Sequence, residues 1–544
     1  MYHGWVLTNV EDIADVTCGQ TTPAVPCSEL SGCNDVTMNT NLFAKDCYFL
    51  FAFALFRWPG NLGKSANHAV VVACLIVNGK NYGPHNFVVP LRDAETHMPL
   101  PGVTIGDIGP KMAYNGVDNG FLGFEQFRIP RMNMLMKHVK VSLPNSKYTR
   151  PPHAKVGYSA MVHVRAHMIA TQAMFLAQAL TTAIRYSAVR RQGEISNGEV
   201  KILEYQTQQH RLLPQLARSY AFIFTGRAVR EYYHKVQKDV ARGKVDDIAE
   251  LHYITSGLKA VVTHLTGQGI EQARMSCGGH GYSKATNIPE LYGVAIGGCT
   301  YEGENMVMLQ QLARYLVKSA EAAQQGKPVG QLVDYLVKPS QPSLPSLRDY
   351  GGHLQAFDKA AKLQVIKASD RLRSLKASGL SDDEAWNANA VELNRAARVH
   401  TRQYIARKFN DYVCAVADVS CREVLQDLLH LHLNYELLDM AYYLLEVSLM
   451  AVQDGYLTGH QLDFMKEDMY RLLAKLRPNA VSLVDAWDYS DHELRSVLGR
   501  RDGHVYENLY KWAQDSELNR TQVLPTFDKY LKPMMHEARE LSKL

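Results

Sequence analysis

The chain has 544 residues, of which 46% are hydrophobic and 21% are charged, and its formal net charge is +5. This length can build two to four domains, and the composition is that of a globular protein rather than a disordered one. The small excess of Lys and Arg is spread along the chain, so nothing indicates nucleic-acid binding. Nine cysteines, an odd number without a C-x-x-C pair, argue against a disulfide framework and favour a reduced intracellular protein.

Membrane and metal signals are missing from the sequence. No apolar run reaches the roughly 18 residues that a membrane span needs, and the run Cys47 to Phe56 is expected to be a buried strand. The 21 histidines show no H-E-x-x-H spacing, so no metal site is predicted. Residues 1–57 hold Thr, Asn and Cys clusters without a sustained period, and we treat them as an atypical N-terminal segment.

Short β-like runs follow in residues 58–145. The stretch His68 to Val77 is nearly continuously apolar, which predicts a buried strand, and Asn78-Gly79 predicts a turn into a second strand at Asn86 to Val89. Residues 120–129 alternate with a period of about two. The spacing of Pro and Gly between these runs predicts a compact β-barrel as the middle domain.

Residues 150–325 change to a helical period of three to four. The predicted helices are Ala160–Arg190, Glu204–Asp239, Ile248–Gln268 and Asn305–Gln324, and we expect them to pack as an antiparallel bundle. Prolines between Pro328 and Pro345 predict a linker at 326–350, and a second helical domain follows over 351–541. The predicted fold class is therefore mainly α with a central β-barrel domain.

Two glycine-punctuated loops lie beside these helices. The loop Cys277 to Tyr282 suits a backbone that comes close to a ligand, because glycine reaches positive φ and has no side chain to hold the ligand away. The loop Thr300 to Asn305 places a carboxylate between Tyr301 and Gly303, before an apolar run. Such a carboxylate is a reasonable general base if its surroundings raise its pKa. A plain turn and a helix cap are the alternatives.

Together the two loops resemble the flavin and catalytic-base motifs of the acyl-CoA dehydrogenase and oxidase superfamily. Four further segments make the chain similar to the peroxisomal acyl-CoA oxidases, namely Trp58–Lys64, Gly106–Lys111, Arg185–Gln192 and Gln206–Gln209. The resemblance runs in order from about Trp58 to the last residue. The family's N-terminal helical domain and its flavin-seating stretch are missing or altered in residues 1–57, which bears on FAD retention.

The resemblance implies FAD as the cofactor, because no side chain accepts a hydride, and an acyl-CoA as the substrate. Glu302 stands at the position of the family's base. The implied cofactor-binding residues are Gly63, Arg190, Gln208, Gln209, His210, Arg211, Gly278, Gly279 and Glu304. The implied substrate-binding residues are Lys155, Val156, Gly157, Tyr158 and Arg165.

Several of these residues have a plainer alternative. Arg190 resembles the family's arginine on the partner subunit's FAD diphosphate, which a bidentate, always charged donor suits, but it could be a solvated helix residue. His210 could be a surface histidine, Gly63 a turn glycine and Glu304 a solvated loop carboxylate.

The implied activity is that of a peroxisomal FAD-dependent acyl-CoA oxidase, which converts acyl-CoA and O₂ to trans-2-enoyl-CoA and H₂O₂ in the first step of fatty acid β-oxidation. Cross-subunit contacts imply a homodimer or a heterodimer with a paralogous oxidase. The end Ser542-Lys543-Leu544 is the address that the peroxisomal import receptor reads. A catalytically silent truncated isoform that dimerises with a full-length acyl-CoA oxidase is the alternative. A dehydrogenase that uses an electron-transfer flavoprotein is disfavoured.

Overall fold

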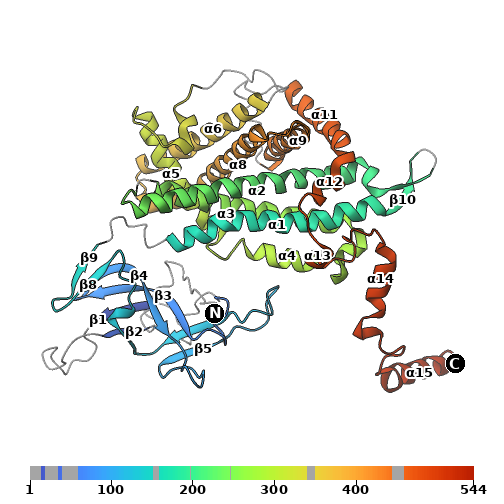
Figure 1. The fold of residues 1–544 in the computed structure, drawn as a ribbon, viewed down its shortest axis with the longest axis horizontal. Coiled ribbons are helices and arrows are strands. Elements are labelled where there is room, and N and C mark those ends of the chain that lie inside the picture. Colours follow the sequence, from blue (N-terminus) through green and yellow to red (C-terminus); the bar gives the residue numbers. More distant parts are fainter. Residues whose placement is uncertain are drawn as a thin grey trace.

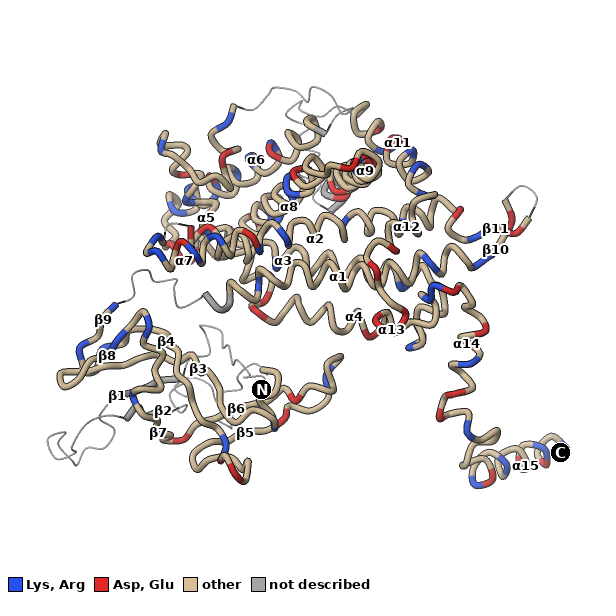
Figure 2. Tube along the Cα trace, viewed as in Figure 1, with Lys and Arg blue, Asp and Glu red and all other residues tan. Residues whose placement is uncertain are grey.

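The computed structural model describes eight stretches of the chain: residues 14–18, 35–39, 59–150, 159–195, 198–245, 247–339, 350–443 and 459–543. Most of the strands gather in one part of the molecule and the long helices form a second, larger part (Figure 1). Within these stretches, no helix combines the length and the apolar character that a membrane crossing requires. Acidic and basic residues are interspersed along the helices drawn in Figure 2.

The predicted hairpin is present. Strands β3 (His68–Val77) and β4 (Lys80–Pro90) pair antiparallel. The two residues between them have positive φ, 52° at Asn78 and 76° at Gly79. Positive φ at both central positions is what a type I′ turn requires, and Asn-Gly adopts it most readily. The sequence signal for this turn is therefore confirmed.

The hairpin belongs to a five-stranded sheet in the order β4-β3-β1-β2-β7. Strand β1 (Ala14–Cys18) runs parallel to β3, and β2 (Asp35–Asn39) runs antiparallel to β1 and to β7 (Phe127–Pro130). The remaining strands form three two-stranded sheets: β5 (Val103–Asp107) with β6 (Gly120–Phe124), β8 (Lys140–Ser142) with β9 (Lys147–Thr149), and β10 (Arg191–Glu194) with β11 (Glu199–Lys201).

The predicted β-barrel is not confirmed. Among the described residues no strand ladder joins the outer strands β4 and β7, and only an isolated bridge pairs Phe87 of β4 with Met134 in the segment after β7. The apolar faces of this part are buried in a different way. Residues of β3 and β4, such as Val71 and Phe87, share one hydrophobic core with Leu122 and Phe124 of the separate β5–β6 hairpin. Packing two small sheets together buries these side chains without closing a barrel.

Four of the long helices lie close to the predicted ranges. They are α1 (Ser159–Val189), α2 (Gln206–Ala241), α3 (Ile248–Ser276) and α5 (Asn305–Gln324). Helix α3 continues eight residues beyond its predicted end at Gln268. It passes through Gly269, where an added Cβ would lie 2.7 Å from a methyl carbon of Leu176 in α1. The glycine serves close packing of the two helices and does not end α3.

The C-terminal helices share one continuous hydrophobic core with these four. That core extends from Ala166 in α1 to Val505 near the end of the chain. Its further helices are α4 (Ile288–Gly297), α6 (Tyr350–Ala377), α7 (Asp382–Ala388), α8 (Ala390–Ala415), α9 (Val419–Tyr443), α11 (Gly459–Leu476) and α12 (Ala480–Asp485). Helix α2 packs against α1 and α3 and also against α8 and α9 (Figure 1). The two predicted helical domains are therefore joined through α2.

The segment predicted as a linker, 326–350, is partly helical. Residues Gln331–Leu336 form a 3₁₀ helix. Val333 and Tyr335 are buried, and the Tyr335 hydroxyl lies 2.9 Å from Nδ1 of His400 in α8. The first half of this segment is thus part of the core, while residues 340–349 lie outside the described stretches.

The last two helices, α14 (Val505–Gln514) and α15 (Lys532–Leu541), leave the body of the molecule. The short helix α13 (Asp491–Leu494) before them still packs on the body, since Leu494 shares a hydrophobic cluster with Ala177 of α1. Val505 at the start of α14 is buried, whereas α15 has no buried residue. Figure 1 shows α15 at the far end of an arm that begins beside the end of α1.

Candidate functional site

The loop between α4 and α5 makes a sharp turn at Glu302. The φ angles are 58° at Glu302 and 101° at Gly303, so two successive residues lie outside the usual region for L-residues. Glu304, the next acidic residue, ends the turn by capping α5. Its carboxylate accepts hydrogen bonds from the backbone N–H groups of Met306 at 2.7 Å and Val307 at 3.3 Å. The loop is therefore fixed at its far end by a helix cap.

The Glu302 carboxyl lies in a partly buried setting that favours its protonated form. Burial raises the pKa of Glu302, while the nearby cations Arg165 and Lys259 act in the opposite direction. Arg165 in α1 is only 3% exposed, and its Nε donates to the backbone carbonyl oxygen of Glu302 at 3.0 Å. A carboxylate whose pKa is raised toward neutrality is suited to proton abstraction at physiological pH.

Lys259 in α3 lies beneath the same loop and is completely buried. Its ammonium donates to the carbonyl oxygen of Gly303 and, at 2.9 Å, to Oδ1 of Asn305. The Asn305 amide in turn donates to the Thr263 hydroxyl at 3.0 Å. Sequence reasoning missed Lys259, although a single lysine between the apolar residues Leu258 and Ala260 was a signal that could have found it.

The loop also contacts the strand-containing part of the molecule. The Tyr301 hydroxyl hydrogen-bonds that of Tyr114, which belongs to the segment between β5 and β6. Gly293 in α4 packs so close to this segment that an added Cβ would lie 3.0 Å from the Cβ of Ala113. Glu302 is therefore placed where the helices meet the strands, and its hydrogen bond with Arg165 sets it near the start of α1.

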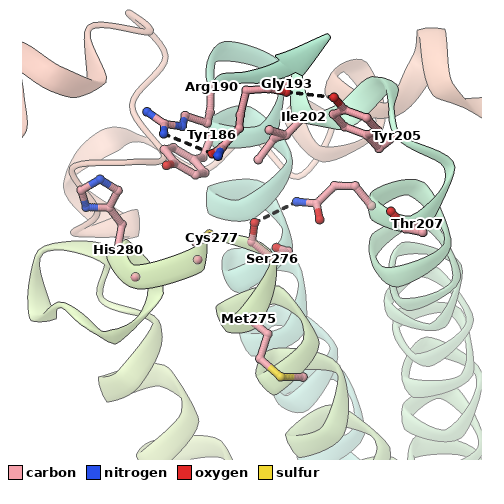
Figure 3. A pocket seen from close by; sticks show the side chains of 14 residues that line it. Tyr186, Arg190, Gly193, Ile202, Tyr205, Thr207, Met275, Ser276, Cys277 and His280 are labelled. Carbon is pink, nitrogen blue, oxygen red and sulfur yellow. Dashed lines mark hydrogen bonds between the residues drawn. The ribbon is translucent and has the colours of Figure 1, made fainter. Parts of the chain in front are cut away.

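A second polar site lies at the other end of the same helices. A cavity of about 570 Å³ is formed by the end of α1, the start of α2 and the loop after α3 (Figure 3). It brings together four residues that sequence reasoning assigned to a cofactor: Arg190, Gln208, Gly278 and Gly279. The other lining residues are Tyr186, Gln192, Gly193, Ile202, Tyr205, Thr207, Met275, Ser276, Cys277 and His280. Their roles were not predicted.

Arg190 and Gln208 differ in how firmly the protein holds them. The Gln208 amide donates to the Ser187 hydroxyl at 3.0 Å and to the Ser276 carbonyl oxygen at 2.8 Å, which ties α2 to α1 and α3. Arg190 is partly exposed, and its guanidinium donates to the Tyr506 hydroxyl at 2.9 Å. That hydrogen bond raises the pKa of Arg190. Its planar cation is thus available at the rim of the cavity.

The glycines of the loop after α3 are of two kinds. An added Cβ would meet nothing within 4 Å at Gly278 or Gly279, so their backbone faces open space, and Gly278 has a φ of 59°. At Gly281 an added Cβ would lie 2.0 Å from the carbonyl oxygen of Arg274. Gly281 is therefore required by packing, while Gly278 and Gly279 leave the backbone accessible to a ligand.

Two neutral groups line this cavity beside Arg190. Burial raises the pKa of the Tyr186 hydroxyl to about 12 and that of the Cys277 thiol to about 12. Both groups therefore stay protonated at physiological pH. Tyr186 lies between Arg190 and His280, with its ring 6.1 Å from the His280 ring (Figure 3). The cavity thus combines the cation of Arg190 with the neutral hydroxyl of Tyr186 and the neutral thiol of Cys277.

The two sites are far apart within one chain. Arg165 lies near the start of α1, and Arg190 follows its last residue. A helix rises 1.5 Å per residue, which separates the two backbones by roughly 38 Å. Figure 1 shows the same arrangement, with the start of α1 beside the strands and its end beside β10.

Comparison with known proteins gives the family. Residues 158–317 match the family model "Acyl-CoA oxidase, C-alpha1 domain", and residues 349–536 match the model "Acyl-CoA oxidase". The chain is 59% identical over 499 residues to acyl-coenzyme A oxidase acox-1.1 of Caenorhabditis elegans, which covers 90% of this chain and 73% of that protein. The chain belongs to the acyl-CoA oxidase family.

Further acyl-CoA oxidases extend this finding. Rat peroxisomal acyl-coenzyme A oxidase 1 is 43% identical over 490 residues, which are 88% of this chain and 73% of the rat protein. The crystal structure of acyl-CoA oxidase-2 of C. elegans, described as bound with FAD, ascaroside-CoA and ATP, superposes with a TM-score of 0.90 at 50% identity. The match covers 99% of this chain and 78% of that one. The prediction of a mainly helical acyl-CoA oxidase fold is confirmed.

Not every residue that the acyl-CoA oxidase motifs suggested lies at one of the two sites. The Gln209 amide donates to the carbonyl oxygen of Leu203 at 3.0 Å, and the His210 ring packs 6.0 Å from the ring of Tyr435 in α9. Burial lowers the pKa of His210. Neither residue lines the cavity, and neither does Arg211. In this structure Gln209 and His210 therefore hold α2 in place.

Three other predictions have different outcomes. Gly63 is packed against backbone, since an added Cβ would lie 3.0 Å from Cα of Asp107. Glu304 is the cap of α5. The substrate-side residues Lys155, Val156, Gly157 and Tyr158 lie outside the described residues, so of that group only Arg165 is placed, beside Glu302.

Proposed function

We propose that this acyl-CoA oxidase is an active FAD-dependent enzyme that converts an acyl-CoA and O₂ to the trans-2-enoyl-CoA and H₂O₂. The observation that carries the proposal is the turn at Glu302, where a carboxyl group of raised pKa is held by Arg165 at the junction of helices and strands. Membership of the oxidase family and the FAD named for the C. elegans structures support the same reaction.

In this proposal Glu302 and Arg165 have different roles in the reaction. Glu302 accepts the proton that leaves the carbon next to the thioester, and its raised pKa makes the carboxylate a stronger base for that transfer. Arg165 holds the Glu302 backbone and places a positive charge beside it. FAD, when bound, would supply the acceptor for the hydride from the β carbon and the redox chemistry that connects it to O₂.

We infer that the cofactor is shared between two subunits. The cavity offers what a diphosphate needs, namely the planar cation of Arg190 and the open backbone at Gly278 and Gly279. That cavity is roughly 38 Å from the Glu302 end of the same chain. In the proposed dimer, Arg190 and Gln208 of one chain therefore bind the FAD that serves the active site of the other chain. The base at that active site is the Glu302 of the other chain. A homodimer, or a heterodimer with a paralogous oxidase, satisfies this requirement.

The proposed location is the peroxisome. Ser542 and Lys543 follow the last residue of α15 and are exposed, at the end of the arm that leaves the body (Figure 1). Leu544 lies outside the described residues. An import receptor reads such an ending only when it is accessible, and the rat relative is named a peroxisomal enzyme.

The visible absorption spectrum of the purified chain tests the proposal. We expect a flavin band that bleaches when palmitoyl-CoA is added without O₂, recovers in air and yields peroxide. A colourless protein that gains no activity with added FAD would refute a self-sufficient oxidase. It would leave the reading in which this chain is a silent subunit that supports a paralogue.

A further inference from the structure

Lys259 has an unusual place for a lysine. It is fully buried in α3, and its neighbours Leu258 and Val262 belong to the hydrophobic core. A buried ammonium is costly unless hydrogen bonds satisfy it. Both acceptors of this ammonium, the Gly303 carbonyl oxygen and Oδ1 of Asn305, belong to the residues just after Glu302. The burial of this charge is therefore coupled to the loop that carries the proposed base.

The loop needs such support because its backbone is strained. Glu302 has a φ of 58°, a region that L-residues other than Asn and Asp seldom adopt. Two consecutive carbonyl groups of this turn are each held by a cation from a different helix. Arg165 in α1 donates to the carbonyl oxygen of Glu302, and Lys259 in α3 donates to that of Gly303. The peptide planes that follow Glu302 are thus fixed from two sides.

We propose that Lys259 is a positioning residue for the reaction, which holds the Glu302–Gly303 turn and keeps a positive charge beneath the Glu302 carboxylate. The inference rests on the proposed function, in which Glu302 is the base. Lys259 acts through the backbone of Gly303 and the amide of Asn305 and does not touch the substrate in this account. Its two effects are to direct the carboxylate and to favour its ionised form.

The charged groups around Glu302 and Lys259 determine the direction in which the pH profile should shift when Lys259 is replaced. Glu302 faces the cations Arg165 and Lys259, and Lys259 is faced by Arg165, Glu302, Glu304 and the Cys299 thiol. The hydroxyl of Tyr301 lies beside the same carboxylate. Burial lowers the pKa of Lys259 to about 8, so the ammonium is charged at pH 7. Removing that charge raises the pKa of Glu302 and moves the acid limb of activity to higher pH.

The first test is Lys259→Met in the full-length, FAD-loaded enzyme. The rate of flavin bleaching by palmitoyl-CoA in a single anaerobic turnover, measured from pH 5 to pH 9, reports on proton abstraction. We expect that rate to fall by on the order of 100-fold, the effect of a misdirected catalytic group. The acid limb of the pH profile should shift to higher pH, while KM for palmitoyl-CoA in the steady state changes little. A surface control, Lys235→Met, removes an exposed ammonium from α2 and should leave the bleaching rate and the acid limb unchanged.

Two further variants separate charge from geometry and serve if Lys259→Met does not fold. Lys259→Gln keeps a donor for Gly303 and Asn305 but removes the charge, so the bleaching rate should recover in part while the acid limb stays shifted. Thr263→Val removes the hydroxyl partner of Asn305 and keeps the charge, so the rate should fall with the acid limb unmoved.

The outcomes decide between the inference and its premise. If Lys259→Met or Lys259→Gln bleaches at the wild-type rate with the wild-type acid limb, Lys259 does not position the base. If both variants merely lose stability, with rate and pH profile intact in the folded fraction, its role is structural and the inference is wrong. If the wild-type flavin is not bleached by acyl-CoA at all, the proposed function fails first.

Discussion

The two ends of α1 carry the two halves of the proposed site, and they are built differently. At the Glu302 end, the carboxyl of the proposed base is partly buried and its loop is held by Arg165, which is nearly buried, and Lys259, which is fully buried. At the Arg190 end, the cation is partly exposed and the glycine backbone faces open space. The first half places the proposed base and its two supporting cations within one chain, whereas the residues described around the second half offer ligand-binding groups and no carboxylate.

This difference indicates what each half requires. A proton-transfer group gains from exclusion of water, because burial is what raises the pKa of a carboxyl group. A site for an anionic cofactor gains from accessible, charged donors. Changes at the two ends should therefore affect different quantities, the chemical step at one end and FAD retention at the other.

The largest expected effect is that of Glu302→Gln. An amide cannot accept the α proton, so kcat should fall by roughly 10³-fold or more. The bound flavin spectrum and the oligomeric state should stay unchanged, because the cavity at the other end is intact. Steady-state peroxide production and the absorption spectrum check both statements. A loss of FAD in this variant would contradict the separation of the two halves.

The next effect compares two glycines of one loop. Gly281→Ala places a methyl group against the Arg274 carbonyl and should lower the free energy of unfolding by about 3 kcal/mol. Gly279→Ala meets open space, so its stability should equal that of the wild type while its affinity for FAD falls. Urea unfolding of the apoprotein and FAD titration separate the two results. Equal stability of the two variants would refute this reading of the loop.

A smaller effect is expected for Arg190→Ala. Loss of a charged donor to the diphosphate should weaken FAD binding by roughly 10- to 100-fold. At saturating FAD the rate of flavin bleaching should return to the wild-type value, because Glu302 lies at the other end of α1. Arg191→Ala changes the adjacent exposed arginine, which pairs with the Glu199 carbonyl, and serves as the matched control. A fall in the bleaching rate that added FAD does not restore would contradict the assignment of FAD retention to the Arg190 end and of the chemical step to the Glu302 end.

The smallest effect concerns stability and pH. The pKa of Glu302 in the folded protein lies above its ordinary value of 4.5, so the folded state binds this proton more tightly than the unfolded state does. Ionising Glu302 therefore costs stability, and the cost grows as the pH rises through the raised pKa. Glu302→Gln should have a higher Tm than the wild type at pH 7, with the difference vanishing below pH 4.5. A difference independent of pH would argue against a raised pKa.

Part of this structure could be predicted from the sequence because its signals are local. The Asn78-Gly79 turn follows from the preference of those two residues for positive φ, and the start of α5 follows from the carboxylate of Glu304. Helix α3 was predicted too short, since Gly269 resembles a stop signal and in fact permits contact with Leu176. The predicted β-barrel was not confirmed, because closure depends on pairing between strands far apart in the sequence, which the local spacing of Pro and Gly does not determine.

The site was predicted unevenly for a similar reason. Glu302, Arg190, Gln208 and the two open glycines could be singled out as candidates because they stand in short motifs. Lys259 was not singled out, because its apolar neighbours Leu258 and Ala260 hint at burial but do not show which carbonyl and amide oxygens the buried ammonium contacts. Gln209 and His210 share the motif of Gln208 but turn toward the interior of the helical body.

The most direct test of the shared site is a mixing experiment with two inactive variants. Glu302→Gln lacks the base, and Arg190→Ala loses FAD when the cofactor is limiting. In a mixed dimer, one site combines the intact Glu302 of one chain with the intact Arg190 of the other. With random exchange, half of the dimers are mixed and each has one intact site of two, so about a quarter of wild-type activity should return. Activity that stays at the sum of the two parents would show that each chain completes its own site.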